Sequence, residues 1–487
     1  MFIVAVDVCI IGGGISGLSA ALTIGERFNL KPSSSEQRST KVVVLEADSQ
    51  LGGRVRSDLT EDGYILDRGF AVFIEEYPIS KQILDYESLH LKQFLPGALV
   101  KVRGRDSFVT VADPRRQPTK LFTAILTPLG TFRDKFRLVR LFLHVLTNTI
   151  GELFNETETD TKTCLKEKYG FSEKIIDEFF TPFYQGIFFS PLEDQSSRMF
   201  HFVLKMFAQG SASLPAGGMQ SVSDQLGNKA QSLGIDVQKQ VKVTKIEKRT
   251  GDRQKESYEY TIHLDGQKSV CSKTIILATD QSSSFRLLST LEGDESFVTS
   301  INDDVPQQSL PQRSVGCVYY TFTTTLPVKE PILILNGDSK GRDNANYPVM
   351  NVCFPSAVNS GYAPTGNHLC SVSVSENVME HYKNKEDELD TAIRKQLGEW
   401  FPEQKEDIIE RWNLKRVYQI NNAQPSQYKS AFPANVNGGR SVNEFLGKSL
   451  PDKIAICGDF MATATFNGAL ESGINAARAI CDKIEQE

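Results

Sequence analysis

The chain has 487 residues, of which 40% are hydrophobic and 23% charged, a composition typical of a soluble globular protein of about two to four domains. Its 54 Lys and Arg residues against 60 Asp and Glu residues give a net charge of −6, which argues against a protein that neutralises nucleic-acid phosphates. Charged residues interrupt every apolar stretch before about 18 residues, so the sequence predicts no transmembrane helix.

The N-terminal residues and the cysteines indicate where the protein works. Met1–Val6 runs straight into a glycine motif and has none of the three regions of a signal peptide, so we expect an intracellular protein, cytoplasmic or organellar. The eight cysteines are scattered without a CxxC pair, which is typical of buried thiols in a reducing compartment. The six histidines show no paired spacing, and we expect no metal site.

The first unit has the order strand, helix, strand. Asp7–Ile11 is predicted as a strand, Ile15–Phe28 as a helix and Lys41–Glu46 as a second strand, which implies parallel pairing and a right-handed crossover. The polar, Ser-rich segment Lys31–Thr40 between them is predicted as a surface loop.

The glycine motif Gly12–Gly17 joins the first strand to the helix and fits the pattern G-x-G-x-x-G. Gly12 permits the tight turn, Gly14 lets the backbone approach a pyrophosphate, and Gly17 allows close packing of helix on strand. Glu46 ends the second strand, where a carboxylate can accept hydrogen bonds from both ribose hydroxyls and would repel a 2′-phosphate, which disfavours NADP.

Two further segments follow the ribose acid. Leu51–Ser57 contains two glycines and Arg54, which suit a second approach to the same pyrophosphate with charge-assisted hydrogen bonds. In Asp67–Phe70, Gly69 would let the chain pass close to a flat ring.

The segment Pro114–Thr147 is basic and amphipathic. Its apolar residues follow helical spacing, which fits either a helix on a membrane surface or a domain helix with a solvated basic face, the second being the commoner case. The apolar residues are Phe132, Phe136, Val139, Phe142, Leu143 and Leu146, and the bases are Arg115, Arg116, Lys120, Arg133, Lys135, Arg137 and Arg140.

Phe179–Phe207 holds nine aromatic residues in helical segments around a turn at Ser190–Gln195. We expect most of these rings in a core, and a subset to line an apolar substrate tunnel. Farther along, the patterns predict a helix at Met219–Leu233, strands at Asp236–Ile246, Tyr258–Leu264 and Lys273–Thr279, an antiparallel sheet from Val315–Thr325, Tyr347–Phe354 and Leu369–Ser375, a helix at Glu386–Trp400, a strand at Lys453–Cys457 and a helix from about Asn467 to Glu485.

The C-terminal segment supplies a second candidate binding element. Cys457-Gly458-Asp459 ends a strand, and Phe466–Gly473 opens the last helix. An extended dinucleotide needs a remote segment to hold its ring, and a helix N-terminus would stabilise the anion of a reduced flavin, with Gly468 and Ala469 permitting the approach.

These motifs together resemble the flavin-containing amine oxidase superfamily, which includes monoamine and polyamine oxidases, protoporphyrinogen oxidases, and carotenoid desaturases and isomerases. The resemblance covers both chain ends and Ser213–Asp280, about half of the chain. The segments that carry it are VCIIGGGISGLSAA, VVVLEADSQLGGRVRS, LDRGF, SLPAGGMQSV, VTKIEK, TIILATD, ICGDF and FNGALESG.

The resemblance implies an FAD cofactor and its contacts. In this family a valine matching Val243 holds the adenine through its backbone, and an acid matching Asp459 lies near the ribityl chain and phosphates. No cysteine lies between Asp459 and Phe466, so we expect noncovalent FAD, and neither the aromatic pair nor the flavin-N5 lysine of amine oxidases can be located. The expected cofactor-binding residues are Gly12, Gly14, Ile15, Ser16, Gly17, Glu46, Ala47, Gly53, Arg54, Gly69, Phe70, Val243, Gly458, Asp459, Phe466 and Ala469.

The expected fold is α/β, with a Rossmann-like FAD-binding domain (1–80, 212–300 and 440–487) interleaved with an α+β substrate domain (81–211 and 301–439), whose helical part at 114–207 could face a membrane. The expected function is an FAD-dependent oxidoreductase that removes hydride from a hydrophobic, polyene or isoprenoid-like substrate. Three alternatives stay open: an amine oxidase that releases aldehyde and hydrogen peroxide, a protoporphyrinogen oxidase, and a non-redox flavin-dependent isomerase.

Overall fold

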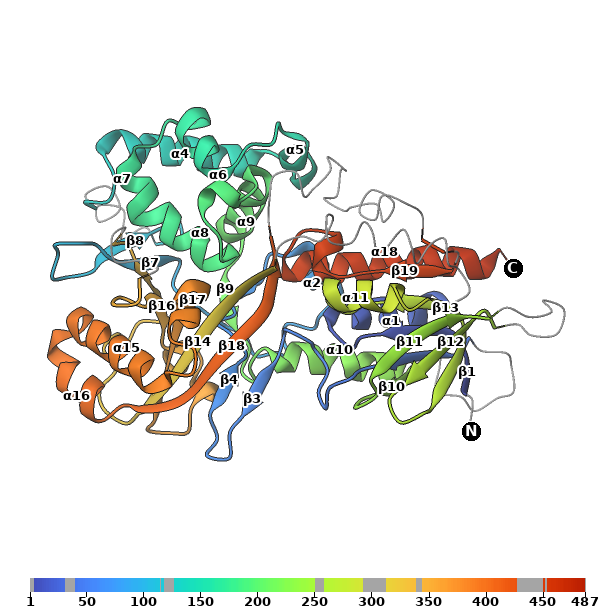
Figure 1. Cartoon of the computed structure of the whole chain (residues 1–487). Coiled ribbons are helices and arrows are strands. Elements are labelled where there is room, and N and C mark those ends of the chain that lie inside the picture. The colour runs from blue at the N-terminus through green and yellow to red at the C-terminus, as the bar shows by residue number, and fades with distance from the viewer. Residues whose placement is uncertain are drawn as a thin grey trace.

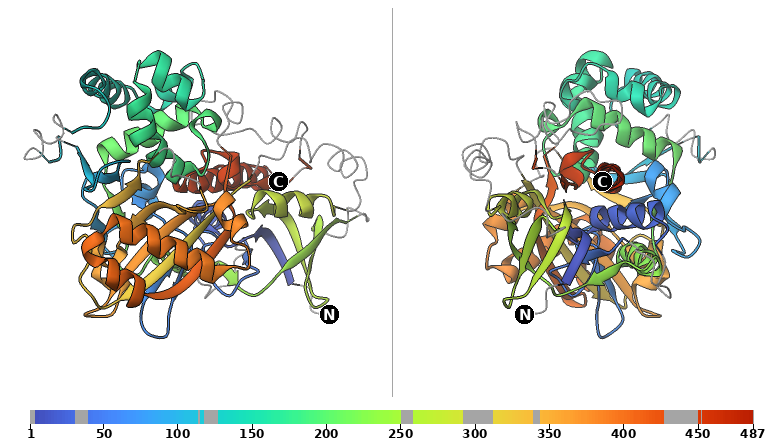
Figure 2. Two further views of the ribbon diagram at one scale, coloured as in Figure 1. Left: turned by 60° about the vertical axis from the view of Figure 1, so that its left-hand side comes forward. Right: turned by 90° about the vertical axis from the view of Figure 1, so that its right-hand side faces the viewer.

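The computed structural model describes residues 4–30, 40–113, 115–117, 127–249, 258–291, 312–338, 344–426, 450–451 and 453–486. Most of the predicted loop at Lys31–Thr40 lies outside these residues. Two sheet-containing parts lie side by side, and a helical region covers the upper side of one of them (Figures 1 and 2).

The first sheet combines strands from both ends of the chain, in the order β10-β2-β1-β13-β12-β11 with β19 also beside β13. The strands β10, β2, β1, β13 and β19 are parallel, and β12 and β11 extend the sheet in antiparallel fashion. Helix α1 joins β1 to β2 in a Rossmann-like unit, which confirms the predicted α/β class. Their bounds are β1 Val4–Ile11, α1 Ile15–Arg27, β2 Val42–Leu45, β10 Asp236–Gln238, β11 Val243–Lys248, β12 Tyr260–Leu264, β13 Ser269–Leu277 and β19 Ile454–Ile456.

The strand predicted at Asp236–Ile246 is wrong as a single element. The structure splits it into β10 and β11, which lie on opposite edges of the sheet. The break falls at Gln240, whose φ of +58° is left-handed, and the backbone N–H groups of Gln240 and Val241 donate to the carbonyls of Asp48 and Glu46. The chain therefore crosses the carboxyl edge of the parallel strands at this point.

The second sheet has the order β18-β14-β17-β16-β15-β7-β8 and is antiparallel except for the parallel pair β15 and β7. Alternate residues of β14 serve two cores: Val318, Tyr320 and Phe322 pack with helix α15, whereas Cys317 and Tyr319 face the opposite side. The bounds are β7 Gly97–Lys101, β8 Val109–Ala112, β14 Gln312–Phe322, β15 Leu333–Asn336, β16 Val349–Cys353, β17 His368–Ser375, α15 Glu386–Trp400, α16 Lys405–Glu410 and β18 Asn413–Pro425.

The helical region packs around aromatic side chains, as the sequence predicts. The rings of Tyr184 and Phe200 lie 4.9 Å apart, and Phe180 and Phe200 lie 6.1 Å apart, all nearly inaccessible to solvent. The helices are α4 Phe132–Thr147, α5 Ile150–Asn155, α6 Thr161–Thr163, α7 Glu173–Ile175, α8 Thr181–Phe188 and α9 Ser197–Gln209, with π-helical turns at Cys164–Lys168 and Ile176–Phe180.

Short elements link these three parts. The strands β5 and β6 pair with β9 in a separate three-stranded sheet, and α18 runs from the middle of the molecule to its right-hand end beside α1 (Figure 1). Among the described residues no helix combines the length and apolar content that a bilayer span requires. The bounds are β3 Ser57–Leu59, β4 Ile65–Asp67, β5 Phe73–Ile74, α2 Pro78–Ile83, β6 Lys92–Gln93, β9 Ala212–Leu214, α10 Gln220–Ser232, α11 Gln281–Leu288, α13 Pro355–Val358, α14 Glu376–His381 and α18 Phe466–Glu485.

Candidate functional site

One large cavity joins all three parts of the molecule. Its volume is about 1380 Å³, above the range of about 300–1,000 Å³ that is usual for a site holding one drug-sized ligand. The cavity begins at the glycine turn after β1, passes Phe70 and the start of α18, and continues between the second sheet and the aromatic face of the helical region. It is therefore large enough for a dinucleotide together with a second molecule.

The glycine turn forms one end of the cavity. Gly12 has a φ of +112°, and a Cβ atom there would lie 2.6 Å from the carbonyl oxygen of Ala278, the residue that follows the neighbouring strand β13. A Cβ atom on Gly17 would lie 2.0 Å from the Gly12 oxygen, whereas one on Gly14 would meet no protein atom within 4 Å. No side chain caps the N-terminus of α1 at Gly14, so the first N–H groups of the helix face open space that suits an anion.

Glu46 stands directly after β2 and is fixed by the backbone. Its Oε2 atom accepts a hydrogen bond from Gly13 N (2.7 Å), and its Oε1 atom accepts one from Asp48 N (2.8 Å). A carboxylate has about four acceptor positions, so both oxygens keep capacity for a further donor from the cavity that Glu46 and Ala47 line. The ribose contact expected for Glu46 remains a prediction that this placement permits.

Gly52 and Gly53 lie against the glycine turn that follows β1. Gly52 N donates to Gly13 O (2.8 Å), and the left-handed φ of +61° at Gly53 turns the chain toward Arg54. Arg54 donates two hydrogen bonds to the Asp459 carboxylate, at 2.8 and 2.7 Å, and both residues line the cavity. The two predicted phosphate-side residues from opposite ends of the chain therefore meet in a bidentate ion pair.

The start of the last helix lines the same part of the cavity. The Thr465 side chain accepts a hydrogen bond from Gly468 N (3.1 Å). Phe466, the first residue of α18, and Ala469, one turn farther along, line the cavity. Farther along α18, a Cβ on Gly473 would lie 2.1 Å from Ser16 O, and Ser19 Oγ donates to Leu470 O (2.9 Å). Helix α18 thus packs directly on α1, as the hypothesis of one cofactor held by both chain ends requires.

Two of the expected cofactor contacts are placed elsewhere. Gly17 packs behind the turn against Gly12, and Gly69 has a φ of +94°, where an added Cβ atom would lie 3.0 Å from the Ile420 side chain; neither glycine lines the cavity. At both positions the lack of a side chain serves backbone packing, and their cofactor contacts remain predictions. The remaining expected residues line it: Gly12, Gly14, Ile15, Ser16, Glu46, Ala47, Gly53, Arg54, Phe70, Val243, Gly458, Asp459, Phe466 and Ala469.

The other end of the cavity is mainly apolar, and sequence reasoning missed two buried polar residues of its lining, Tyr184 and Asn351. Tyr184 and Asn351 line the cavity, and the Tyr184 hydroxyl and the Asn351 amide oxygen have no hydrogen-bond partner among the described residues. Burial raises the pKa of Tyr184 well above its usual value, so its phenol stays neutral and can donate. An orphaned buried polar group is costly, so each of the two would gain from a hydrogen bond to any ligand that reached it. The apolar lining includes Phe179, Phe183, Ile187, Phe207, Leu333 and Leu335.

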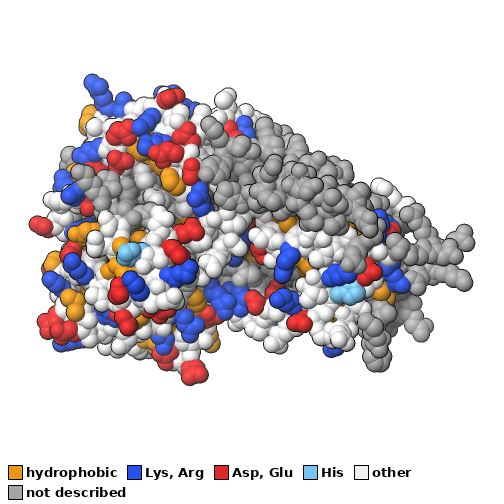
Figure 3. Space-filling view, viewed as in Figure 1, with side chains coloured by type: hydrophobic (Ala, Val, Ile, Leu, Met, Phe, Trp, Pro, Cys, Tyr) orange, Lys and Arg blue, Asp and Glu red, His pale blue; other side chains and the backbone are white. Residues whose placement is uncertain are grey.

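Basic side chains stand at the rim near α4. Arg115 pairs with Asp113 (2.6 Å), Arg116 donates to Gly210 O (2.7 Å), and Lys135 donates to Leu129 O (2.9 Å). All of them line the cavity, so its rim on this side is positively charged while its interior is not. By contrast, acidic and basic side chains are intermixed over the face shown in Figure 3.

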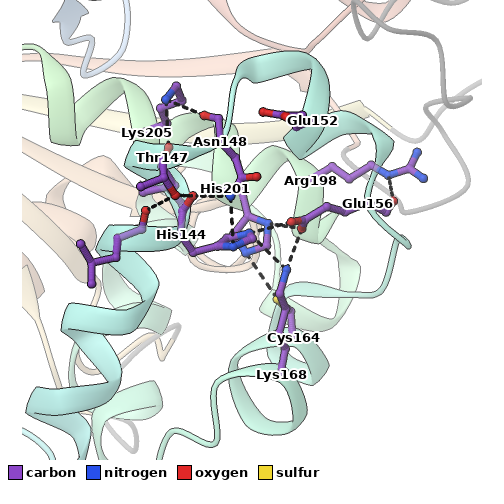
Figure 4. A network of polar contacts seen from close by, with 12 residues as sticks. His144, Thr147, Asn148, Glu152, Glu156, Cys164, Lys168, Arg198, His201 and Lys205 are labelled. Carbon is purple, nitrogen blue, oxygen red and sulfur yellow. Dashed lines mark hydrogen bonds and ion pairs between the residues drawn. The ribbon is translucent and has the colours of Figure 1, made fainter.

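The helical region also contains a compact cluster of His144, Glu156 and His201 (Figure 4), whose side chains offer metal-ligand atoms within 4.8 Å of one another. The Lys168 ammonium lies 2.7 Å from Glu156 Oε2 and 3.3 Å from His144 Nε2, where it provides the positive charge that a metal ion would bring. Although burial alone would raise it, hydrogen bonds from His201 and Lys168 lower the pKa of Glu156 to about 2. We interpret the cluster as an internal polar network that joins α4 to α9.

Comparison with known proteins places these features in a family. A family model described as flavin containing amine oxidoreductase matches residues 15–481, and no curated protein matches the sequence significantly. The fold is similar to a putative protoporphyrinogen oxidase from Exiguobacterium sp. 255-15 (TM-score 0.65, 16% identity, covering 100% of this chain and 99% of that one). It is also similar to a putrescine oxidase with bound putrescine (0.64, 15%, 99% and 100%) and to cyclohexylamine oxidase from Brevibacterium oxydans IH-35A (0.62, 15%, 99% and 99%).

The residues of this chain fit the cofactor of that family. One cavity connects the open space over Gly14 and the uncapped N-terminus of α1 with Glu46, whose carboxylate can accept further hydrogen bonds. The same cavity reaches the start of α18, as an extended FAD requires. Because the family match spans nearly the whole sequence, this chain belongs to the flavin-containing amine oxidoreductase family and is an FAD-dependent oxidoreductase.

Proposed function

We propose that this enzyme oxidises a hydrophobic substrate of polyene or isoprenoid type, by removal of a hydride from a C–H bond. The observation that carries the proposal is the continuity of the cavity: its dinucleotide end opens into a part lined by aromatic and aliphatic side chains. The binding free energy of a long apolar molecule becomes more favourable in proportion to the apolar surface that it buries against such a lining.

The chain's own residues would position the substrate and keep it dry. When bound, FAD supplies the hydride acceptor, so the reaction needs few acidic or basic side chains from the protein. Phe179, Phe183 and Phe207 of the helical region present apolar surface to the cavity and exclude water. The Tyr184 hydroxyl and the Asn351 amide are then the groups that would orient a polar end or a polarisable segment of the substrate.

We further propose that FAD is held without a covalent bond. All eight cysteines lie within the described residues, all are buried, and none lines the cavity. Burial also raises the pKa of Cys457, the cysteine nearest in sequence to the start of α18, to about 12, which keeps its thiol unreactive. Acid precipitation of the enzyme should therefore release all of the flavin into the supernatant.

The lining charges weigh against an amine substrate. Of the carboxylates that line the cavity, Asp113 and Asp459 are paired with Arg115 and Arg54, and Glu46 and Asp280 lie at its dinucleotide end. An ammonium group would enter an apolar space without an uncommitted counter-charge, which is unfavourable.

A second candidate has one specific observation in its favour. The rim bases Arg115, Arg116 and Lys135 would attract a substrate that carries carboxylates around an apolar body, as protoporphyrinogen does. In that case the apolar interior holds the macrocycle, and the rim holds its carboxylates.

Anaerobic reduction of the purified flavoprotein distinguishes these functions. The flavin absorbance is recorded with a carotenoid-type polyene, protoporphyrinogen, and a panel of amines, and the products are identified by mass spectrometry. Bleaching by the polyene, with a product two hydrogens lighter, supports the proposal. Bleaching by amines alone, with aldehyde and hydrogen peroxide in air, refutes it, as does isomerised product without net electron transfer.

A further inference from the structure

Helix α4 turns an apolar stripe toward solvent. Phe132 and Phe136 are each 67% exposed, and Val139 and Leu143 are each 58% exposed. Half of the large hydrophobic residues that the structure shows exposed are on this one helix, and their spacing of four, three and four residues puts them on one line along it. The face that a surface helix normally fills with polar side chains is therefore apolar here.

The stripe is presented by a helix that is firmly held. On the opposite face Leu141 and Val145 are fully buried in the aromatic core. At the N-terminus Asp134 is fully buried and accepts hydrogen bonds from Thr131 N (2.7 Å) and Ser172 Oγ (2.6 Å). Because both attachments fix the rotation of α4, the outward stripe cannot turn into the core.

Basic residues flank the stripe. Arg133 and Arg140 are exposed and, at about 100° per residue, lie along one side of the apolar line, while Lys135 lies on its other side. An outward apolar stripe with a basic border is the pattern of a helix that rests in the interface of an anionic bilayer. The sequence left a solvated basic face as the commoner interpretation, but the outermost line of α4 is apolar.

The same stripe borders the cavity. Phe132, Phe136, Val139 and Leu143 all contribute to the lining of the cavity that reaches Phe183 and Phe207. A molecule dissolved in the acyl chains beneath α4 could therefore enter the cavity without crossing water.

We propose that the α4 stripe (Phe132, Phe136, Val139 and Leu143) docks the enzyme on an anionic lipid bilayer, and that its substrate enters beside this helix. The docking itself is independent of the substrate; the entry route rests on the proposed function. The shared border of stripe and cavity favours a bilayer over a partner protein, because a protein seated on α4 would cover this side of the cavity.

Flotation of the purified holoenzyme with vesicles tests the docking. One set of vesicles contains phosphatidylcholine and phosphatidylglycerol, and the other contains phosphatidylcholine alone. We expect flotation with the anionic set, weaker flotation at high salt, and little with the neutral set. Replacing Phe132 and Phe136 by Ser should weaken binding by about a hundredfold, about tenfold for each half-inserted ring. Leu59→Ser is the matched control: Leu59 is 75% exposed, belongs to β3, and lies far from α4 (Figure 1).

The charge variant keeps the test decisive if the double Phe variant loses its flavin. Arg133→Glu should reduce anionic binding by several-fold and leave any binding to neutral vesicles unchanged. The proposal is overturned if the wild type floats with neither set, or if the Phe variant floats like the wild type. A dimer that light scattering detects in the wild type but not in the Phe variant overturns it too, because a second copy would then be what covers the stripe. Failure of polyene turnover with intact flotation would refute the proposed function alone.

Discussion

Gly14 and Gly17 belong to one motif, yet the structure predicts opposite consequences for their replacement by alanine. Gly14 has φ −70° and ψ 171°, which any residue adopts, and its Cβ would meet no protein atom within 4 Å. The reduced entropy of the unfolded chain and the weaker N-cap preference of alanine oppose each other, so the free energy of unfolding should change by less than about 1 kcal/mol. The methyl group would project into the space that we assign to the pyrophosphate.

For Gly14→Ala we therefore expect a loss of FAD affinity of about tenfold to a hundredfold, or about 1.4–2.8 kcal/mol, with nearly unchanged stability. Gly17→Ala should do the reverse. Its Cβ would lie 2.0 Å from Gly12 O, so α1 must move away from the turn at a cost of about 3 kcal/mol or more.

Urea unfolding of the apoprotein and titration with FAD, followed by flavin fluorescence, measure the two quantities separately. If Gly14→Ala binds FAD as tightly as the wild type and remains as stable, the space over Gly14 is not where the pyrophosphate lies. If it unfolds as easily as Gly17→Ala, the distinction drawn from the Cβ distances is wrong.

Three further predictions concern single buried polar groups. Asn351→Leu should lower kcat/KM by about tenfold and leave the thermal midpoint nearly unchanged, because the amide oxygen has no protein partner to lose; an unchanged kcat/KM would remove Asn351 from the substrate site. Burial raises the pKa of Glu471 from 4.5 to about 7. The protonated side chain therefore contributes its full stability below pH 4.5, and this contribution is lost as the pH rises through 7. The difference in free energy of unfolding between wild type and Glu471→Gln should shift by up to about 3 kcal/mol over that range in urea titrations. Although burial opposes it, hydrogen bonds from Ser172 and Thr131 hold the pKa of Asp134 well below its usual value. Asp134→Asn should therefore lower the free energy of unfolding by roughly 3 kcal/mol at pH 7, and by less as the pH falls below the usual aspartate pKa toward the folded pKa. The same loss at pH 7 and at acidic pH in urea titrations would contradict this.

The sequence predicts the cofactor end well because its signals are local. The turn at Gly12–Gly17 lies between a strand and a helix, as its pattern demands, and the last helix begins at Phe466, one residue before the predicted start. In these segments the glycines and the apolar residues contact partners within the same strand–turn–helix unit. Their pattern in the sequence is therefore enough to predict the local fold.

The substrate end is less predictable, since tertiary contacts define it. Strand β18, Asn413–Pro425, is missed entirely because its residues are mostly polar and its alternation is weak, and it forms only by pairing with β14 at the sheet edge. Nothing near Asn351 in the sequence distinguishes it from a surface asparagine. Its burial without a partner arises only when β16 faces the helical region.

The position of β19 in the first sheet governs the order in which the enzyme can be made. β1 and β19 lie far apart in the sequence, and β19 is synthesised after β1, yet both pair with β13, and α18 packs on α1. Until the ribosome has released the C-terminal segment, half of one edge of β13 lacks its neighbour and Arg54 lacks Asp459. The cofactor end of the cavity is consequently complete only after the segment from β19 to the start of α18 has been synthesised.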